Sequence, residues 1–220
     1  MKNLLDNDYK IEGIFPLPLY MAKRNSDLDT REEAEIKEII EEGMYDPGKG
    51  DSSGGNWTTH NSYIFDTKLE KLKQFCDEHI TNYVREVFNP KDDIEYYITQ
   101  SWISITNPGE WHPHHRHANS IISGVFYIDT EDTDRLTWTD PNIDHKEKGL
   151  QTQPKEFNKW NGPEWSAAVE KNMLLLFPSW MTHYVPINKS ERSKPRMTLA
   201  FNSYGKGTFG SKAQRNELIL

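Results

Sequence analysis

The pattern of hydrophobic and polar positions divides the chain near residue 93. Before that point, TREEAEIKEIIEEG (30–43) places its apolar residues on one helical face, and Thr30 with Glu33 predicts a capping box at its start. A second segment with helical spacing runs from about residue 68 to 88. We therefore predict two helices in the first part of the chain.

Four other stretches do not show this helical spacing. IFPLPLYMAKR (14–24) is apolar but interrupted by proline, which predicts an edge strand. DPGKGDSSGGNW (46–57) is rich enough in glycine to form a mobile loop or a lid. Residues 140–166 are charged and carry three large aromatic residues, which predicts an insertion between strands. The tryptophan-rich stretch 157–180 is interpreted mainly as core packing.

The second part of the chain has a strand pattern. Six short runs rich in β-branched and aromatic residues are separated by Pro, Gly, Asn and Asp: IEYYITQSWISIT, SIISGVFYID, RLTWT, NMLLLFP, HYVPIN and RMTLAFNSY. Such runs predict an all-β unit, either a sandwich or a jelly roll. The predicted fold class is α+β in a single domain, 1–220, with a helical part at about 1–93 and a β core at about 94–205.

Composition and charge narrow the range of partners. The chain has 220 residues, with 26 basic and 34 acidic side chains and a net charge of −8, so a nucleic-acid partner is not favoured. The first residues, MKNLLDNDYK, lack the apolar core of a signal peptide, and no stretch reaches the length of a membrane span. The expected location is the cytoplasm. Cys76 is the only cysteine and lies on the apolar face of the second predicted helix, so it is interpreted as a core residue.

The candidate chemistry lies in EWHPHHRHANSIISGVFYID (110–129), where four histidines fall within six positions. Alternate side chains of a strand point to the same face, so either His112 with His114 or His115 with His117 would chelate one ion. A third ligand must come from another strand. His183, between LLLFPSWMT and YVPIN, is the best candidate and is expected to begin a strand.

Arg196 follows His183 by thirteen residues, and Thr198 lies on the same strand face. A buried arginine needs a carboxylate partner, and its planar guanidinium can bind one through two parallel hydrogen bonds. Because no obvious acidic partner stands nearby in the sequence, a carboxylate ligand is predicted.

These motifs together resemble the 2-oxoglutarate- and Fe(II)-dependent oxygenases, whose jelly roll, the double-stranded β-helix, holds the metal. More narrowly, the chain is similar to a bacterial and bacteriophage subgroup of these oxygenases that is related to prolyl hydroxylases. The resemblance covers roughly residues 11 to 203 and rests on IFPLPLY, NWTTHNSYIF, HRHANSIISGVFYI, LLLFPSWMTHYVP and RMTLAFN, in that order.

The resemblance selects His115 and His117 as the ligand pair and His183 as the distal ligand, with no catalytic residue beyond the metal centre. It implies that Arg196 anchors 2-oxoglutarate with help from Thr198. Tyr127 matches a tyrosine that bonds the same carboxylate, and Asn107 matches a group near the other carboxylate more loosely. The implied cofactors are Fe(II) and 2-oxoglutarate. The implied partners are 2-oxoglutarate, O2 and an unidentified protein or small-molecule substrate, with the host cytoplasm as the location if the chain is phage-encoded.

One position departs from the pattern of the superfamily, because His117 stands where an aspartate or glutamate is usual. Three neutral ligands leave the charge of the iron unbalanced, and the diagnostic two-histidine, one-carboxylate set is absent. Two alternatives therefore stay open. One is a cupin-like three-histidine metalloenzyme that does not use 2-oxoglutarate, and the other is a jelly roll with a structural metal.

Overall fold

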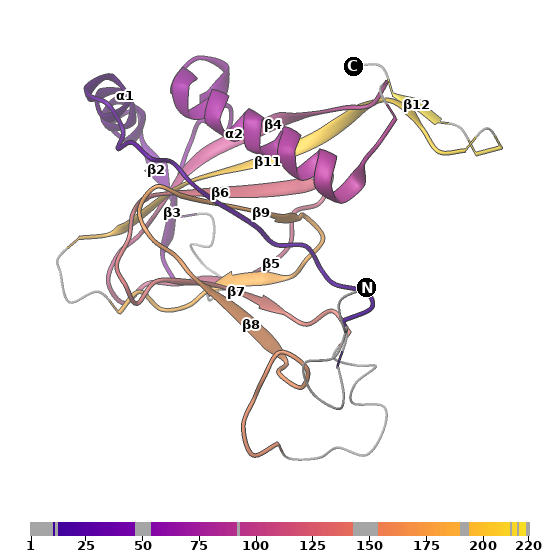
Figure 1. The fold of residues 1–220 in the computed structure, drawn as a ribbon. Coiled ribbons are helices and arrows are strands. Elements are labelled where there is room, and N and C mark those ends of the chain that lie inside the picture. Colours follow the sequence, from indigo (N-terminus) through magenta and orange to yellow (C-terminus); the bar gives the residue numbers. More distant parts are fainter. Residues whose placement is uncertain are drawn as a thin grey trace.

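The computed structural model describes residues 11, 13–46, 54–91, 93–142, 154–189, 194–211, 213–214 and 216–218 (Figure 1). The central part of the predicted glycine-rich loop (47–53) and the central part of the predicted insertion (143–153) lie outside these residues, and the last two residues of that loop, Asn56 and Trp57, belong to strand β3 instead. In chain order the elements are β1 (Tyr20–Lys23), α1 (Thr30–Glu41), β2 (Met44–Tyr45), β3 (Asn56–Thr59), the 3-10 turn η1 (Ile64–Asp66), α2 (Glu70–Tyr83), the π-turn η2 (Val84–Phe88), β4 (Glu95–Thr106), β5 (His112–His115), β6 (Ile122–Asp129), β7 (Arg135–Thr139), β8 (Glu164–Ala168), β9 (Met173–Pro178), β10 (His183–Val185), β11 (Arg196–Phe209) and β12 (Asn216–Leu218).

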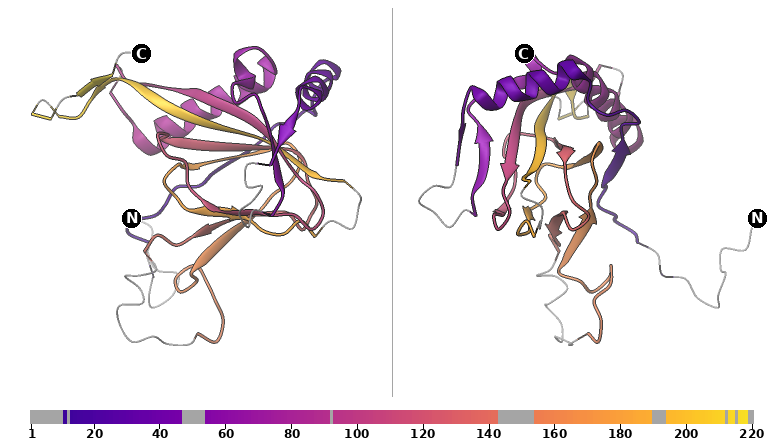
Figure 2. Two further views of the ribbon diagram at one scale, coloured as in Figure 1. Left: turned by 180° about the vertical axis from the view of Figure 1, so that it is seen from behind. Right: turned by 90° about the vertical axis from the view of Figure 1, so that its left-hand side faces the viewer.

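The strands form two antiparallel sheets that face each other. The larger sheet has the order β1-β9-β6-β11-β4-β3-β2, with β12 paired to β11, and the smaller has the order β5-β10-β7-β8. Both helices cover the outer face of the larger sheet, and the smaller sheet lies on its other side (Figures 1 and 2). This is a jelly roll with helices packed on one face, so the predicted α+β double-stranded β-helix is confirmed. All six predicted strand runs are strands, and β1 is at the sheet edge as predicted.

The first helix begins with a different cap from the predicted one. The Asp29 side chain accepts a hydrogen bond from the Glu32 backbone N–H, and Glu32 accepts one from the Asp29 N–H, so the capping box starts one residue earlier than Thr30. Aspartate competes well with threonine at this position, and its carboxylate favours the positive end of the helix. Arg24 also bonds to Glu32, which fixes the helix start against the end of β1.

The larger sheet separates two apolar cores because its side chains alternate between faces. On β11, Leu199 and Phe201 pack with the helices, and Cys76 lies in the same core with its side chain fully buried, as predicted. Tyr127 and Phe177 pack on the opposite face, between the two sheets. Arg196 and Thr198 alternate with Leu199 and therefore also face the space between the sheets.

The first 93 residues contribute more than helices, because β1, β2 and β3 all join the larger sheet. Their runs are short, and β3 (NWTT) carries only one strongly apolar residue, so the hydrophobic pattern alone did not predict β2 or β3. Among the described residues, no helix is long and apolar enough to cross a membrane.

Candidate metal centre

Three of the predicted site residues converge between the sheets. One ligand nitrogen from each of His115, His117 and His183 lies within 4.8 Å of the other two. The rings of His115 and His183 are 4.2 Å apart, and the ring of His117 lies 5.1 Å from His115 and 5.2 Å from His183. The spacing allows all three to bind one ion.

A register shift decides which histidines of β5 face this point. His115 pairs with His183 and His112 pairs with Val185, so four residues of β5 lie opposite three residues of β10. His112 and His115 therefore share the inner face although they are three positions apart. His114 points the other way, where its ring lies 4.1 Å from Tyr184. His117 lies beyond the end of β5, so His115 and His117 are not the alternate residues of one strand that the sequence pattern predicted.

Two of the rings are held in a tautomer that leaves Nε2 free to bind a metal. The Nδ1 atom of His115 lies 2.8 Å from the Pro113 carbonyl oxygen, and that of His183 lies 2.9 Å from the Met181 carbonyl oxygen. A carbonyl only accepts, so Nδ1 carries the proton and Nε2 keeps a free lone pair. Burial lowers the pKa of His183 to about 2 and that of His117 to about 4, and proximity to His115 acts in the same direction on both. Burial also lowers the pKa of His115. The three imidazoles are thus neutral at pH 7, which is the form that binds metal.

A cluster of hydroxyl groups joins the loop that carries His117 to the loop that precedes His183. Ser179 Oγ lies 2.7 Å from Ser120 Oγ and 2.8 Å from Ser123 Oγ, and Ser123 donates to Asn202. The Ser179 carbonyl accepts from the His117 backbone N–H at 3.0 Å. This serine cluster (Ser120, Ser123, Ser179) therefore ties the loop after β5 to the loop before β10.

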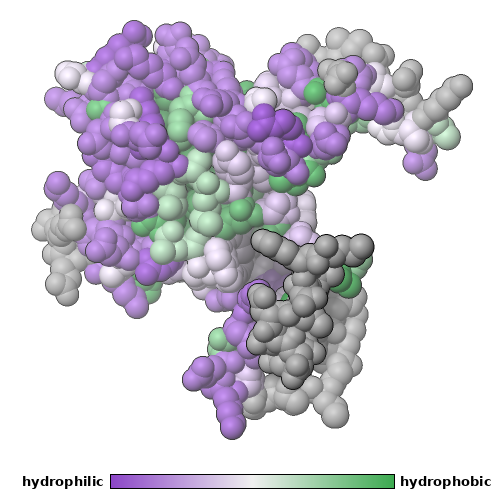
Figure 3. Space-filling view, in the orientation of Figure 1, coloured by the Kyte–Doolittle hydropathy of each residue, from purple (hydrophilic) through white to green (hydrophobic). Residues whose placement is uncertain are grey.

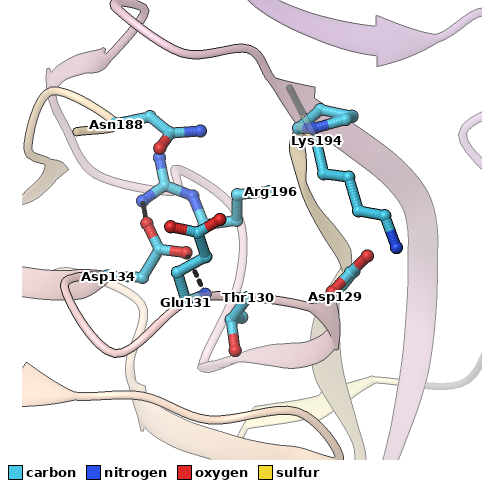
Figure 4. Close-up of a pocket in the computed structure, with 8 residues that line it drawn as sticks. Asp129, Thr130, Glu131, Asp134, Asn188, Lys194 and Arg196 are labelled. Carbon is cyan, nitrogen blue, oxygen red and sulfur yellow. Dashed lines mark hydrogen bonds and ion pairs between the residues drawn. The ribbon is translucent and has the colours of Figure 1, made fainter. Parts of the chain in front are cut away.

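Arg196 has a protein partner that the sequence analysis did not identify. Its Nη1 donates to Asp134 Oδ1 at 2.8 Å, and both side chains are only 3% exposed. Figure 4 shows the guanidinium between Asp134 and Asn188. This partner is not close to Arg196 in the sequence, because Asp134 is 62 residues away and is brought in by the fold, just before β7. The other terminal nitrogen, Nη2, is buried and has no hydrogen-bond partner among the described residues.

The remaining predicted site residues are Tyr127 on β6, Thr198 on β11 and Asn107 just after β4. Tyr127 is buried, and the charge of Arg196 acts on its hydroxyl, so the two side chains are neighbours. Thr198 pairs with Tyr127 in register across β11 and β6. Asn107 lies in the turn after β4, where its side-chain amide donates to Glu110 at 2.9 Å.

An open groove of about 660 Å³ lies beside the centre, between the N-terminal segment and the residues that flank the β7–β8 connection. Its walls are mainly apolar, and Trp138, which lines it, pairs in register with His183. Trp160 and Trp165, 40% and 49% exposed, also line it, so for these two the interpretation as core packing was wrong. The N-terminal wall includes Phe15 at 89% exposure. Figure 3 shows apolar surface at the centre of the face that this segment crosses.

Sequence reasoning missed Asp134 and the serine cluster. Asp134 ends the acidic run DTEDTD, which reads as an ordinary polar turn, and the serines lie in separate segments. Only the inward direction of each side chain distinguishes them from surface residues.

Comparison with known proteins agrees with this fold. Residues 100–202 match the family described as "Putative 2OG-Fe(II) oxygenase". The fold is similar to a Pseudomonas putida prolyl-4-hydroxylase, with 11% identity and a TM-score of 0.54 over 84% of this chain and 92% of that one. It is similar to a Trichoplax adhaerens prolyl hydroxylase in complex with a hypoxia inducible factor peptide fragment, with 13% identity and a TM-score of 0.54 over 84% and 83%. It is also similar to HygX from Streptomyces hygroscopicus, with nickel, 2-oxoglutarate and hygromycin B bound, with 8% identity and a TM-score of 0.52 over 85% and 82%. No curated protein matches the sequence. The match to the 2OG-Fe(II) oxygenase family thus covers the β core of this chain, residues 100–202.

Proposed function

We propose that this protein is an Fe(II)- and 2-oxoglutarate-dependent dioxygenase that hydroxylates a protein side chain or a small molecule. One observation carries the proposal. Three neutral imidazoles converge on a single point, and a buried guanidinium with an unpartnered nitrogen faces the same space between the sheets. The family match over the same strands supports this assignment.

In the proposal, His115, His117 and His183 hold the iron. Imidazole is a suitable ligand for Fe(II), and the Nδ1 bonds of His115 and His183 orient their rings. Three neutral ligands leave the double positive charge of the ion uncompensated by the protein. A dianionic co-substrate bound to the ion would compensate it, which is a reason for an all-histidine site to favour 2-oxoglutarate.

Arg196 is proposed to bind the far carboxylate of 2-oxoglutarate through Nη2, with Tyr127 and Thr198 beside it. A guanidinium held on one side by Asp134 still presents donors on the other side. Asn107 stays a proposed contact of the second carboxylate, although its amide also bonds to Glu110. When both cofactors are bound, they couple the conversion of 2-oxoglutarate and O2 to succinate and CO2 with the transfer of one oxygen atom to the substrate. The protein residues position the reactants and exclude water.

The groove beside the metal centre is proposed to bind the substrate. Trp138 and Met181 line it, and both are neighbours of His183, so a ligand in the groove lies next to the metal ligands. Its apolar, tryptophan-rich walls and a few polar side chains, Asp140 and Glu164 among them, are typical of a site for an organic substrate.

The test compares His115→Ala with His114→Ala. His114 is on the same strand but is exposed and faces away from the centre, so it is a matched control. The wild type and His114→Ala should bind about one Fe(II) and form succinate from 2-oxoglutarate in air, whereas His115→Ala should do neither. A wild-type protein that binds iron but neither binds 2-oxoglutarate nor forms succinate would contradict the proposal and favour a three-histidine enzyme without this co-substrate.

A further inference from the structure

His112 is a fourth histidine on the inner face of β5, and the metal triad does not use it. Its ring is stacked on that of His115, with 4.1 Å between centroids and 11° between planes. The stack results from the register shift that brings both residues to the same face of the strand. His112 is not one of the three residues whose ligand atoms converge.

The start of β5 also adjoins the Arg196 pocket. The backbone N–H of Asn188 donates to the Glu110 carbonyl at 2.8 Å, two residues before His112. The Asn188 side chain lies beside the guanidinium of Arg196 (Figure 4). Burial and proximity to His115, Arg196 and His117 all lower the pKa of His112, so its imidazole lies near both parts of the proposed cofactor site.

The imidazole of His112 has ring contacts but no hydrogen bond to any described residue. Its side chain is only partly exposed, and a neutral imidazole always carries one N–H donor and one acceptor. A polar group in such a position is normally satisfied by water or by a ligand. Phenylalanine or leucine would fill the same space against His115 without this requirement, so packing alone does not call for a histidine.

We propose that His112 is a 2-oxoglutarate-binding residue, whose ring N–H donates a hydrogen bond to a carboxylate of the co-substrate between the metal triad and Arg196. The inference rests on the proposed function and adds a residue to it. A neutral donor suits this place, because it binds the carboxylate without bringing another positive charge close to the metal and to Arg196.

The experiment separates a hydrogen-bonding role from a packing role. His112→Phe keeps an aromatic ring against His115 but has no donor, and His112→Asn keeps a donor but loses the ring. His114→Phe makes the same chemical change on the outer face of β5 and is the matched control. Fe(II) affinity and 2-oxoglutarate affinity are measured separately under anaerobic conditions, the latter also through the visible charge-transfer absorption of the iron–keto-acid chelate.

We expect His112→Phe to bind Fe(II) normally and to bind 2-oxoglutarate roughly tenfold more weakly or worse, as expected for a lost hydrogen bond to a charged group. His112→Asn should recover part of that loss, and His114→Phe should resemble the wild type. Normal 2-oxoglutarate affinity in iron-loaded His112→Phe would overturn this inference alone. Loss of iron in His112→Phe would overturn it too, because His112 would then act through the metal ligands. A wild type that binds iron but no 2-oxoglutarate would overturn the proposed function itself.

Discussion

The pairing of Arg196 with Asp134 gives a prediction that separates a cofactor anchor from a structural ion pair. Arg196→Ala removes the cation and leaves the Asp134 carboxylate buried, with its Oδ2 still accepting from the Glu131 backbone N–H at 2.9 Å. Asp134→Ala leaves the guanidinium buried in the same way. The double variant removes both charges at once.

The magnitudes follow from the burial of the pair, since both side chains are 3% exposed. Removing one partner of a buried ion pair typically costs about 3–5 kcal/mol of stability, because the remaining charge is uncompensated. The double variant should be destabilised by at least about 2 kcal/mol less than the sum of the single variants, since residues in one network are coupled. Losing a buried contact to the 2-oxoglutarate carboxylate costs about 2–5 kcal/mol, or at least roughly tenfold in affinity.

The assay combines urea denaturation of the metal-free variants with anaerobic 2-oxoglutarate binding to the Fe(II)-loaded proteins. Both single variants should lose stability, but only the two that lack Arg196 should lose 2-oxoglutarate affinity. Arg196→Lys should be intermediate, because it keeps the charge without the planar fork. A folded, iron-loaded Arg196→Ala protein that binds 2-oxoglutarate normally would refute the anchor role and leave Arg196 as a structural partner of Asp134.

Three further predictions address the ligand set, the serine cluster and the helical core. His117→Asp should still bind Fe(II), because carboxylate is also a suitable ligand, and metal analysis showing complete loss of iron in the folded variant would argue against a site at these residues. Ser179→Ala should leave the hydroxyl groups of Ser120 and Ser123 with fewer hydrogen bonds, which should lower the free energy of unfolding by about 1–3 kcal/mol in a denaturation experiment. The variant should also bind iron more weakly. Unchanged iron affinity would show that the serine cluster contributes to stability alone. Tyr83→Phe should cost nothing or stabilise the protein, because the buried Tyr83 hydroxyl has no partner among the described residues. Burial raises the pKa of Tyr83 to about 12, so the wild type should lose stability as the pH rises from about 10 to 12, and the same loss in Tyr83→Phe would exclude Tyr83 as its source.

The sequence by itself determined the fold class and the identity of the metal-binding candidates. The six strand runs are long enough for β-branched and aromatic residues to dominate the local pattern, and each is a strand in the structure. The three histidines were identified because several imidazoles stand together just before a predicted strand and another is expected to begin a strand. This chemical pattern can be recognised in the sequence alone. Selecting His115 and His117 over the neighbouring pair nevertheless needed the family resemblance.

Only the tertiary structure decided which residues far apart in the sequence come into contact. Asp134 is a turn residue by its sequence, and only the antiparallel return of the chain between the sheets brings it to Arg196. The inward direction of His112 depends on a one-residue register shift between β5 and β10, which strand alternation does not predict. Side-chain direction and long-range pairing are set by how the sheets close on each other. For that reason the local pattern, together with the family resemblance, identified the candidate metal ligands, whereas the partner of Arg196 and the inward position of His112 required the folded chain.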